Sequence, residues 1–204
     1  MDAVRRFFLF LRSPPSLPRG MPGRISRHNH GVAIRVAIIT VSDGVAAGAR
    51  ADEGGPACEQ TLRSSGVEHR IVAREVLPDE SKQVARAIRV RADAGEADLI
   101  LLTGGTGVSP RDRTPEGVRE AIEFEVPGLA EKMRAETSRG FSAAYLSRQI
   151  AGVRKKALIV ALPGSPKGAA DCLAAILPLV PHAIALIRGE KPEHPRPASG
   201  APAR

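Results

Sequence analysis

The sequence predicts an α/β fold, a three-layer α/β/α domain with a mostly parallel central sheet. Two observations predict it. Short, almost wholly apolar and β-branched runs have no polar face, which is typical of strands covered on both sides. These runs alternate with segments of helical period, and such alternation places helices on both faces of a parallel sheet. At 204 residues, 43% hydrophobic and 25% charged, the chain is long and apolar enough for one such domain.

The first two strands are each followed by a helix. VAIRVAIITV at 32–41 is the first strand, and a helix follows over about Glu53–Ser65, ended by Gly66. The second strand is Glu68–Leu77. The next helix runs from about Asp79 to Ala94, where the apolar residues recur at helical spacing.

The third strand, DLILLT at 98–103, precedes two helices. These are expected at about Pro115–Glu125, with Thr114 as N-cap and Pro115 at the first helical position, and at about Gly128–Ser138.

The last third of the body combines a hairpin with two apolar helices. A short helix and a strand entering a hairpin are expected within 141–156, followed by the strand ALIVAL at 157–162. One helix begins at Pro166, and the last spans about Pro178–Arg188.

Charge separates two tails from this body. Residues 1–31 carry six arginines against Asp2, and both 1–31 and the proline-rich 191–204 lack apolar period, so we expect flexible tails. The body at 32–190 then has a net charge of only +1, out of +8 for the chain. The basicity belongs to the ends, and we expect no nucleic-acid partner.

The same counts argue against other classes of protein. No apolar run approaches the roughly 20 residues of a membrane-spanning helix, so no membrane partner is expected. The apolar stretch Phe7–Leu11 is short for a secretory signal; a flexible extension or translation from Met21 are the alternatives. Cys58 and Cys172 lack metal-site spacing, which indicates core residues and a reducing cytoplasm.

Small, polar or acidic residues follow all four parallel strands. The carboxyl ends of such strands share one edge of the sheet, where ligands bind. We therefore expect these exits to face one crevice: Ser42-Asp43-Gly44, Pro78-Asp79-Glu80, Thr103-Gly104-Gly105-Thr106-Gly107-Val108-Ser109-Pro110-Arg111-Asp112 and Pro163-Gly164-Ser165-Pro166.

The glycine-rich loop at 103–107 suits phosphate oxygens, because its backbone N–H groups are uncovered. No Lys-Ser or Lys-Thr follows the glycines, and no GxGxxG follows the first strand, so neither a P-loop nor a dinucleotide fingerprint is present. A tight turn between strand and helix is the alternative, which the length of the following segment disfavours.

Asp79 and Asp112 are candidate Mg²⁺ ligands, since magnesium favours one or two carboxylates together with nucleotide phosphates. Asp43 could join them or cap its own loop. The alternatives are that Asp79 is the N-cap of the following helix and Asp112 a member of a solvated charge cluster.

Two further pairs are candidate anion contacts. Ser165-Pro166 reads as N-cap and first helical residue, which aims a helix N-terminus at the same edge, with Lys167 beside it. Ser147-Arg148 could contribute another contact, or Arg148 could lay its alkyl stem on the core. The residues alone thus indicate metal-assisted phosphoryl or nucleotidyl transfer on anionic small molecules.

The motifs VAIITVSDG, LPDE, LLTGGTGVSPRDRTPE, VPG, LSRQIAGVRKKALIVALPGSPKG and ILPLVPHAIALIRG together resemble the molybdopterin adenylyltransferases, the MogA/MoaB-type proteins and the gephyrin G domain. The resemblance covers about residues 32–190. It implies the three-layer MogA/MoaB-like fold, usually a trimer, that uses Mg²⁺ and ATP to convert molybdopterin to adenylyl-molybdopterin with release of pyrophosphate. The molybdenum-insertion enzyme of the pathway is an implied partner.

The resemblance also assigns residues. It implies catalytic and Mg²⁺-binding roles for Asp79 and Asp112. Substrate-binding positions that it and the loop pattern imply are Ser42, Asp43, Thr103, Gly104, Gly105, Thr106, Gly107, Ser109, Pro110, Arg111, Ser147, Arg148, Pro163, Gly164 and Ser165. Relatives often carry Lys where Glu53 stands, so no phosphate contact is predicted there. A non-catalytic molybdopterin carrier of MoaB type is the alternative, and the presence of both acids favours the enzyme.

Overall fold

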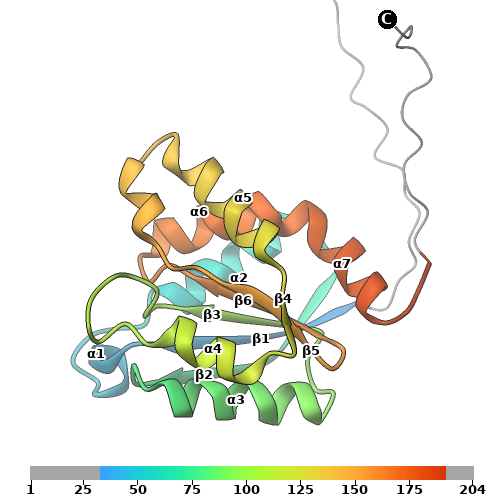
Figure 1. The fold of residues 1–204 in the computed structure, drawn as a ribbon, viewed down its shortest axis with the longest axis horizontal. Coiled ribbons are helices and arrows are strands. Elements are labelled where there is room, and N and C mark those ends of the chain that lie inside the picture. Colours follow the sequence, from blue (N-terminus) through green and yellow to red (C-terminus); the bar gives the residue numbers. More distant parts are fainter. Residues whose placement is uncertain (1–32, 192–204) are drawn as a thin grey trace, which may run out of the picture. The chain divides into compact units, whose positions relative to one another are not determined.

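A computed structural model describes residues 33–191, which form a six-stranded sheet in the order β2-β1-β3-β6-β5-β4 (Figure 1). The four parallel strands are β1 (Ile34–Val41), β2 (His69–Leu77), β3 (Leu99–Thr103) and β6 (Ala157–Leu162). β5 (Ala151–Arg154) runs antiparallel to β6, and β4 (Phe124–Glu125) antiparallel to β5. The predicted mostly parallel sheet is confirmed. The tails predicted at 1–31 and 191–204 lie outside the described residues, apart from Lys191.

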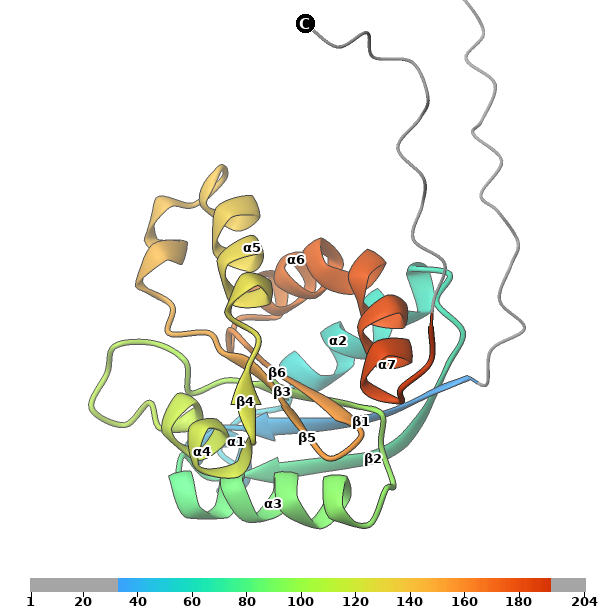
Figure 2. The same cartoon turned by 45° about the vertical axis from the view of Figure 1, so that its right-hand side comes forward.

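Helices cover both faces of the sheet and make three layers (Figures 1 and 2). One face carries α2 (Gly54–Ser64), α5 (Pro127–Ser138), α6 (Pro166–Ile176) and α7 (Val180–Ile187). The other carries α3 (Ser81–Asp93) and α4 (Thr114–Ala121). Three short helices complete the set: α1 (Asp43–Ala46) and the 3₁₀ helices η1 (Ser142–Leu146) and η2 (Leu177–Leu179).

Two apolar cores lie on opposite faces of the strands. In β3, Leu99 and Leu101 pack into the core beneath α2, α5, α6 and α7, whereas Ile100 and Leu102 pack against α3 and α4. All four side chains are fully buried. Alternation along a strand that is covered twice therefore explains the continuous apolar runs of the sequence.

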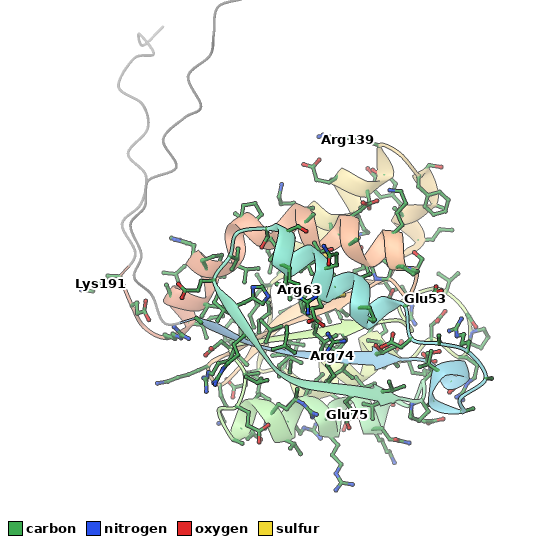
Figure 3. The ribbon with its side chains drawn as sticks, turned by 180° about the vertical axis from the view of Figure 1, so that it is seen from behind. Glu53, Arg63, Arg74, Glu75, Arg139 and Lys191 are labelled. Atoms are coloured by element: carbon green, nitrogen blue, oxygen red, sulfur yellow. The ribbon has the colours of Figure 1, made fainter. Side chains whose placement is uncertain are left out.

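The edge strand β2 is tied to both helical layers by charge. Arg74 points to the α2 side, where it and Arg63 form ion pairs with the buried Glu59 (Figure 3). Its neighbour Glu75 pairs with Arg91 of α3 at 2.6 Å. Because successive strand residues face opposite sides, one dipeptide links the edge strand to both layers.

The C-terminal helices correct one expectation. Within the described residues, one helical run, Pro166–Ile187, is long and apolar enough to cross a membrane by length and composition, so the statement that no apolar run approaches that length is wrong. In the fold, 39% of the 18-residue apolar stretch within this run is buried. Leu173 and Ile176 belong to the core on the face of the sheet that α2, α5, α6 and α7 cover. The 3₁₀ turn η2 interrupts the run.

Several predicted boundaries also differ. The helix expected at Pro115–Glu125 ends at Ala121, because Phe124 and Glu125 pair with β5 as a two-residue strand. It begins at Thr114, flanked by Arg113, so Thr114 is not its N-cap. The short helix and hairpin expected within 141–156 are confirmed as η1 and β5–β6.

Candidate functional site

The four parallel strand exits meet at one edge of the sheet, as predicted. The Ser42 backbone N–H donates to the Leu77 carbonyl at 2.8 Å, which joins the exits of β1 and β2. Gly104 joins the exits of β3 and β6 through its N–H to Leu162 at 3.1 Å. A side chain at Gly104 would lie 2.0 Å from the Val41 carbonyl oxygen, so only glycine allows β1 and β3 to converge so closely.

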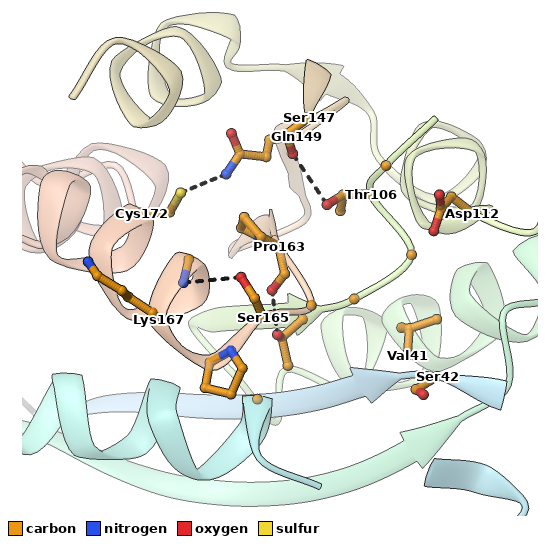
Figure 4. Close-up of a pocket in the computed structure, with 18 of the residues that line it drawn as sticks. Val41, Ser42, Thr106, Asp112, Ser147, Gln149, Pro163, Ser165, Lys167 and Cys172 are labelled. Atoms are coloured by element: carbon orange, nitrogen blue, oxygen red, sulfur yellow. Dashed lines mark hydrogen bonds between the residues drawn. The ribbon is translucent and has the colours of Figure 1, made fainter. Parts of the chain in front are cut away.

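A cavity of about 830 Å³ opens at this edge (Figure 4). Asp112 and Ser42 lie at one side of it, and Cys172 and Lys167 at the other. Twelve of the predicted site residues line it: Ser42, Asp79, Thr103, Gly104, Gly105, Thr106, Gly107, Asp112, Ser147, Pro163, Gly164 and Ser165. The loop pattern at the strand exits thus corresponds to a single concave site.

Asp79 occupies the acidic end of the cavity in a partly buried position. Its Oδ2 accepts from the Asp43 backbone N–H at 3.1 Å, and its Oδ1 is buried without a hydrogen-bond partner. Burial raises the pKa of Asp79, and the neighbouring charges of Asp43 and Asp112 add to this effect against the backbone hydrogen bond. Glu80, not Asp79, flanks the start of α3, so the alternative that Asp79 caps this helix is wrong.

Gly105 leaves the space that Asp79 needs. Its φ of +61° is in the left-handed region, and a Cβ there would lie 2.4 Å from both Asp79 Oδ1 and Thr114 Oγ1. Thr114 is completely buried, and its hydroxyl also lacks a hydrogen-bond partner. The absence of a side chain at Gly105 therefore lets the two unpartnered oxygens of Asp79 and Thr114 lie beside its backbone.

Asp43 and Arg111 form an ion pair outside the cavity lining. The Arg111 guanidinium donates to both Asp43 carboxylate oxygens at 2.8–3.0 Å and to Glu80 at 3.2 Å. The backbone hydrogen bond from Asp79 and those from Arg111 hold the pKa of Asp43 below its ordinary value. This pair links the exits of β1 and β3 across the rim.

The remaining predicted residues support the loop rather than face the cavity. Ser109 donates its backbone N–H to Asp112 Oδ2 at 2.8 Å, and Pro110 is exposed between Ser109 and Arg111. Arg148 donates to the carbonyl oxygens of Gly107 and Asp112 at 2.7 and 2.6 Å. Asp112 is thus held by the loop itself, not free in a solvated charge cluster.

The opposite side of the cavity carries the N-terminus of α6. Ser165 caps this helix by accepting from the Gly168 backbone N–H at 3.3 Å, which confirms its predicted capping role. Lys167, in the first turn, pairs with Asp171 at 2.5 Å. A helix N-terminus and an ammonium group favour an anion on this side.

Some lining residues have no counterpart in the predicted set. Arg50 donates to Ser42 Oγ at 2.7 Å, and its position as the cation of the first exit loop was a usable signal. Gln149 donates to Cys172 Sγ at 2.9 Å, and burial raises the pKa of that thiol. Phe141 and Leu146 are exposed on the α5–η1 segment at the cavity's mouth. Their contribution depends on long-range folding, for which the sequence holds no local signal.

The side chains of Asp79 and Asp112, at one end of the cavity, are of a kind that fits a magnesium ion. Within residues 33–191, no group of three or more His, Cys, Asp or Glu side chains could hold a metal by itself. Asp79 Oδ1 lacks a partner, and Asp112 lies close enough for its charge to act on Asp79. Two neighbouring carboxylates suit Mg²⁺, which commonly takes its other ligands from phosphates and water.

The fold and the site together define a three-layer α/β protein with a glycine-rich cavity at the carboxyl edge of its sheet. A profile described as "Probable molybdopterin binding domain" matches residues 37–182, and the chain belongs to this family.

Named relatives agree with this assignment. A molybdopterin adenylyltransferase of Helicobacter pylori is 34% identical over 156 residues, 76% of this chain and 89% of that protein. The Escherichia coli K12 molybdopterin adenylyltransferase is 34% identical over 69% of this chain and 72% of its own length. The molybdopterin biosynthesis enzyme MoaB of Thermus thermophilus superposes with a TM-score of 0.72 at 47% identity, covering 77% of this chain and 98% of that one.

Proposed function

We propose that the protein is a molybdopterin adenylyltransferase of molybdenum cofactor biosynthesis. It transfers AMP from Mg-ATP to the phosphate of molybdopterin and releases pyrophosphate. The observation that carries this proposal is the pair of carboxylates, Asp79 and Asp112, beside a glycine-rich loop in a cavity of about 830 Å³. Relatives that carry the adenylyltransferase name span most of the chain.

The reaction needs positioning more than covalent chemistry. An oxygen of the molybdopterin phosphate attacks the α-phosphorus of ATP and forms a new P–O bond. The bond between the α-phosphorus and its bridging oxygen breaks, and pyrophosphate leaves with that oxygen. The cavity walls hold the two phosphates in line, which avoids the entropic cost of their encounter.

The chain's own groups would stabilise the negative charge on the α-phosphate of the transferred adenylyl group. Gly105 and Gly107 present uncovered backbone to the cavity, and the α6 N-terminus with Lys167 presents positive charge from the opposite wall. Asp79 and Asp112 would hold Mg²⁺, which when bound neutralises triphosphate charge. Arg111 stays paired to Asp43 and keeps the loop after β3 at the rim.

The same proposal extends to the setting of the enzyme. We infer a homotrimer in the cytoplasm that passes adenylyl-molybdopterin to the molybdenum-insertion enzyme, as the family resemblance implies. Size-exclusion chromatography with light scattering tests the trimer, and a monomer at micromolar concentration contradicts it.

The turnover assay tests the function directly. Full-length protein, purified molybdopterin and Mg-ATP are mixed, and release of pyrophosphate is followed. Asp112→Ala is expected to retain molybdopterin binding and to lose about 100-fold or more of the rate, because the remaining carboxylate cannot place the metal and phosphates alone.

Asp93→Ala is the matched control, since Asp93 is a paired surface acid on α3 whose partner is Arg154. Undiminished pyrophosphate release by Asp112→Ala rejects the role of Asp112. Wild-type protein that binds molybdopterin yet releases no pyrophosphate supports the carrier instead.

A further inference from the structure

Arg148 connects the glycine-rich loop to a distant segment of the chain. It lies two residues after the end of η1, and its backbone N–H donates to the Thr106 carbonyl at 2.8 Å. Its guanidinium donates through Nε to the Gly107 carbonyl at 2.7 Å and through Nη2 to the Asp112 carbonyl at 2.6 Å. Both ends of the loop segment 107–112 are therefore held by one side chain.

The geometry of the guanidinium explains why both carbonyls are held together. Nε and Nη2 present parallel N–H groups along one edge of a rigid plane, and the two carbonyl oxygens lie at this edge. Nη1, on the other edge, forms an ion pair with Glu116 in the first turn of α4. A lysine has the charge but not this fixed fork, so it cannot hold three acceptors in one plane.

Glu116 is charged in this arrangement. Burial would raise the pKa of Glu116, but the hydrogen bonds from Arg148 and from the Glu116 backbone, with the nearby charges of Arg148 and Arg113, together outweigh it and lower that pKa. Arg148 therefore forms an ion pair with the charged carboxylate of Glu116, in the helix that follows the loop.

The backbone on both sides of Arg148 is also held in place. Arg134 of α5 donates to the Gln149 carbonyl at 3.1 Å and to the Ser147 carbonyl at 3.4 Å, on either side of Arg148. The Ser147 and Thr106 hydroxyls lie 3.4 Å apart and link the same two segments. The segment that carries Arg148 is thus tied to α5 on one side and to the loop on the other.

Asp112 depends on this loop geometry. Its Oδ2 accepts from the Ser109 backbone N–H at 2.8 Å, and its own N–H donates to the Ser109 carbonyl at 3.0 Å. Asp112 lines the cavity, whereas Arg148 does not belong to the lining formed by the described residues. The position of the Asp112 carboxylate is therefore set by a backbone that Arg148 holds.

We infer that Arg148 is a positioning residue for the proposed adenylyl transfer, which places the Asp112 carboxylate by fixing the backbone of 107–112. This inference rests on the proposed function. This role differs from that of an anion contact, since the guanidinium of Arg148 donates to two carbonyls and a carboxylate of the protein itself.

The test compares Arg148→Lys with Arg154→Lys in the full-length protein. Arg154 is a matched control, because it also pairs with a carboxylate, Asp93, and donates to a backbone carbonyl, that of Ala121 at 2.9 Å. Three quantities are measured: amide hydrogen exchange over residues 105–116, kcat and KM for pyrophosphate release, and Tm. Arg148→Ala, assayed with and without added guanidinium ion, provides a rescue experiment.

For Arg148→Lys we expect exchange over 105–116 to rise at least tenfold, with the rest of the domain unchanged. We expect kcat to fall roughly 10- to 100-fold while the KM for molybdopterin changes little, because misplacing Asp112 impairs the transition state more than substrate binding. Guanidinium ion should restore part of the kcat of Arg148→Ala. Arg154→Lys should alter neither the loop exchange nor kcat.

Three results would overturn the inference. Unchanged exchange in Arg148→Lys shows that Arg148 does not brace the loop, and faster exchange with unchanged kcat shows that the brace does not serve the reaction. A rise in the KM for ATP with unchanged kcat and exchange assigns Arg148 to anion binding. If Arg148→Ala does not fold, Arg148→Lys decides the matter. If wild-type protein releases no pyrophosphate, the proposed function fails. The comparison of amide hydrogen exchange between Arg148→Lys and Arg154→Lys still decides whether Arg148 fixes the backbone of 107–112.

Discussion

Asp79 carries its charge in a place where the folded protein disfavours it. Its carboxylate is partly buried beside two other acids, and its Oδ1 has no hydrogen-bond partner. The charged form of Asp79 is therefore unfavourable in the folded protein. A bound cation would offset this cost.

Replacing Asp79 with Asn should therefore stabilise the protein and stop the reaction. The raised pKa means that the folded state binds the proton more tightly than the unfolded chain, so the wild-type charge lowers stability above the unfolded pKa near 4. We expect Tm to rise at pH 7, and this gain to shrink as the pH falls through the raised pKa of Asp79 and to be absent below about pH 4. Calorimetry from pH 3 to pH 8 checks this, and a lower Tm for Asp79→Asn at pH 7 contradicts it.

Gly105 is the second residue whose replacement has a defined outcome. An alanine Cβ would lie 2.4 Å from Asp79 Oδ1 and from Thr114 Oγ1, in a backbone conformation that alanine disfavours. We expect Gly105→Ala to cost about 1–3 kcal/mol in urea unfolding and to abolish pyrophosphate release. Gly128→Ala is the control, because it lies in helix α5 with nothing within 4 Å of the added methyl group and should be neutral or stabilising.

At the scale of elements, a buried acid joins the end of the fold to its beginning. Asp98, just before β3, accepts from the Arg35 side chain at 2.8–3.0 Å and pairs with Arg188, after α7, at 2.9 Å. Burial would raise the pKa of Asp98, but the hydrogen bonds from Arg35 and Arg188 outweigh it and lower the pKa to about 2. The cluster ties β1, β3 and α7 at the edge opposite the cavity.

Asp98 should make stability depend on acid pH. With its pKa lowered from 3.8 to about 2, Asp98 contributes about 2 kcal/mol above pH 4, and this contribution disappears as the pH falls through 2. Asp98→Asn should therefore destabilise the protein at pH 7 and converge with wild type near pH 2. Glu190→Gln, which removes a weaker partner of Arg188 at 3.8 Å, should change little. Equal urea midpoints for wild type and Asp98→Asn at pH 7 would disprove this role.

The strands also show which elements the apolar pattern of the sequence can predict and which it cannot. The apolar runs at 32–41 and 157–162 predict strands covered on both faces, and the sheet confirms them. The two-residue strand β4 was not predicted, because Phe124 and Glu125 are exposed and extended only through pairing with Val153 and Gly152. A strand without apolar alternation leaves no local signal.

At the scale of the whole molecule, the excess positive charge and the candidate site belong to different parts of the sequence. The cavity belongs to the near-neutral body, whereas the excess positive charge belongs to residues outside 33–191. We expect a protein lacking 1–31 and 192–204 to release pyrophosphate within about twofold of the full chain and to show no salt-dependent binding to DNA. Filter binding over a salt series measures this, and strong salt-dependent binding by the shortened protein refutes the argument from charge.

The sequence by itself determined the parallel α/β architecture, the four polar strand exits, the glycine-rich loop and the family resemblance. Each depends on neighbours along the chain: apolar period, turn residues and motif spacing. Only the tertiary structure decided that Asp43 faces Arg111, 68 residues away, and that Arg148 holds the carbonyls of Gly107 and Asp112. Such contacts depend on where the fold brings distant charges together, because a charged side chain takes whichever partner lies within reach, and local sequence does not encode that distance.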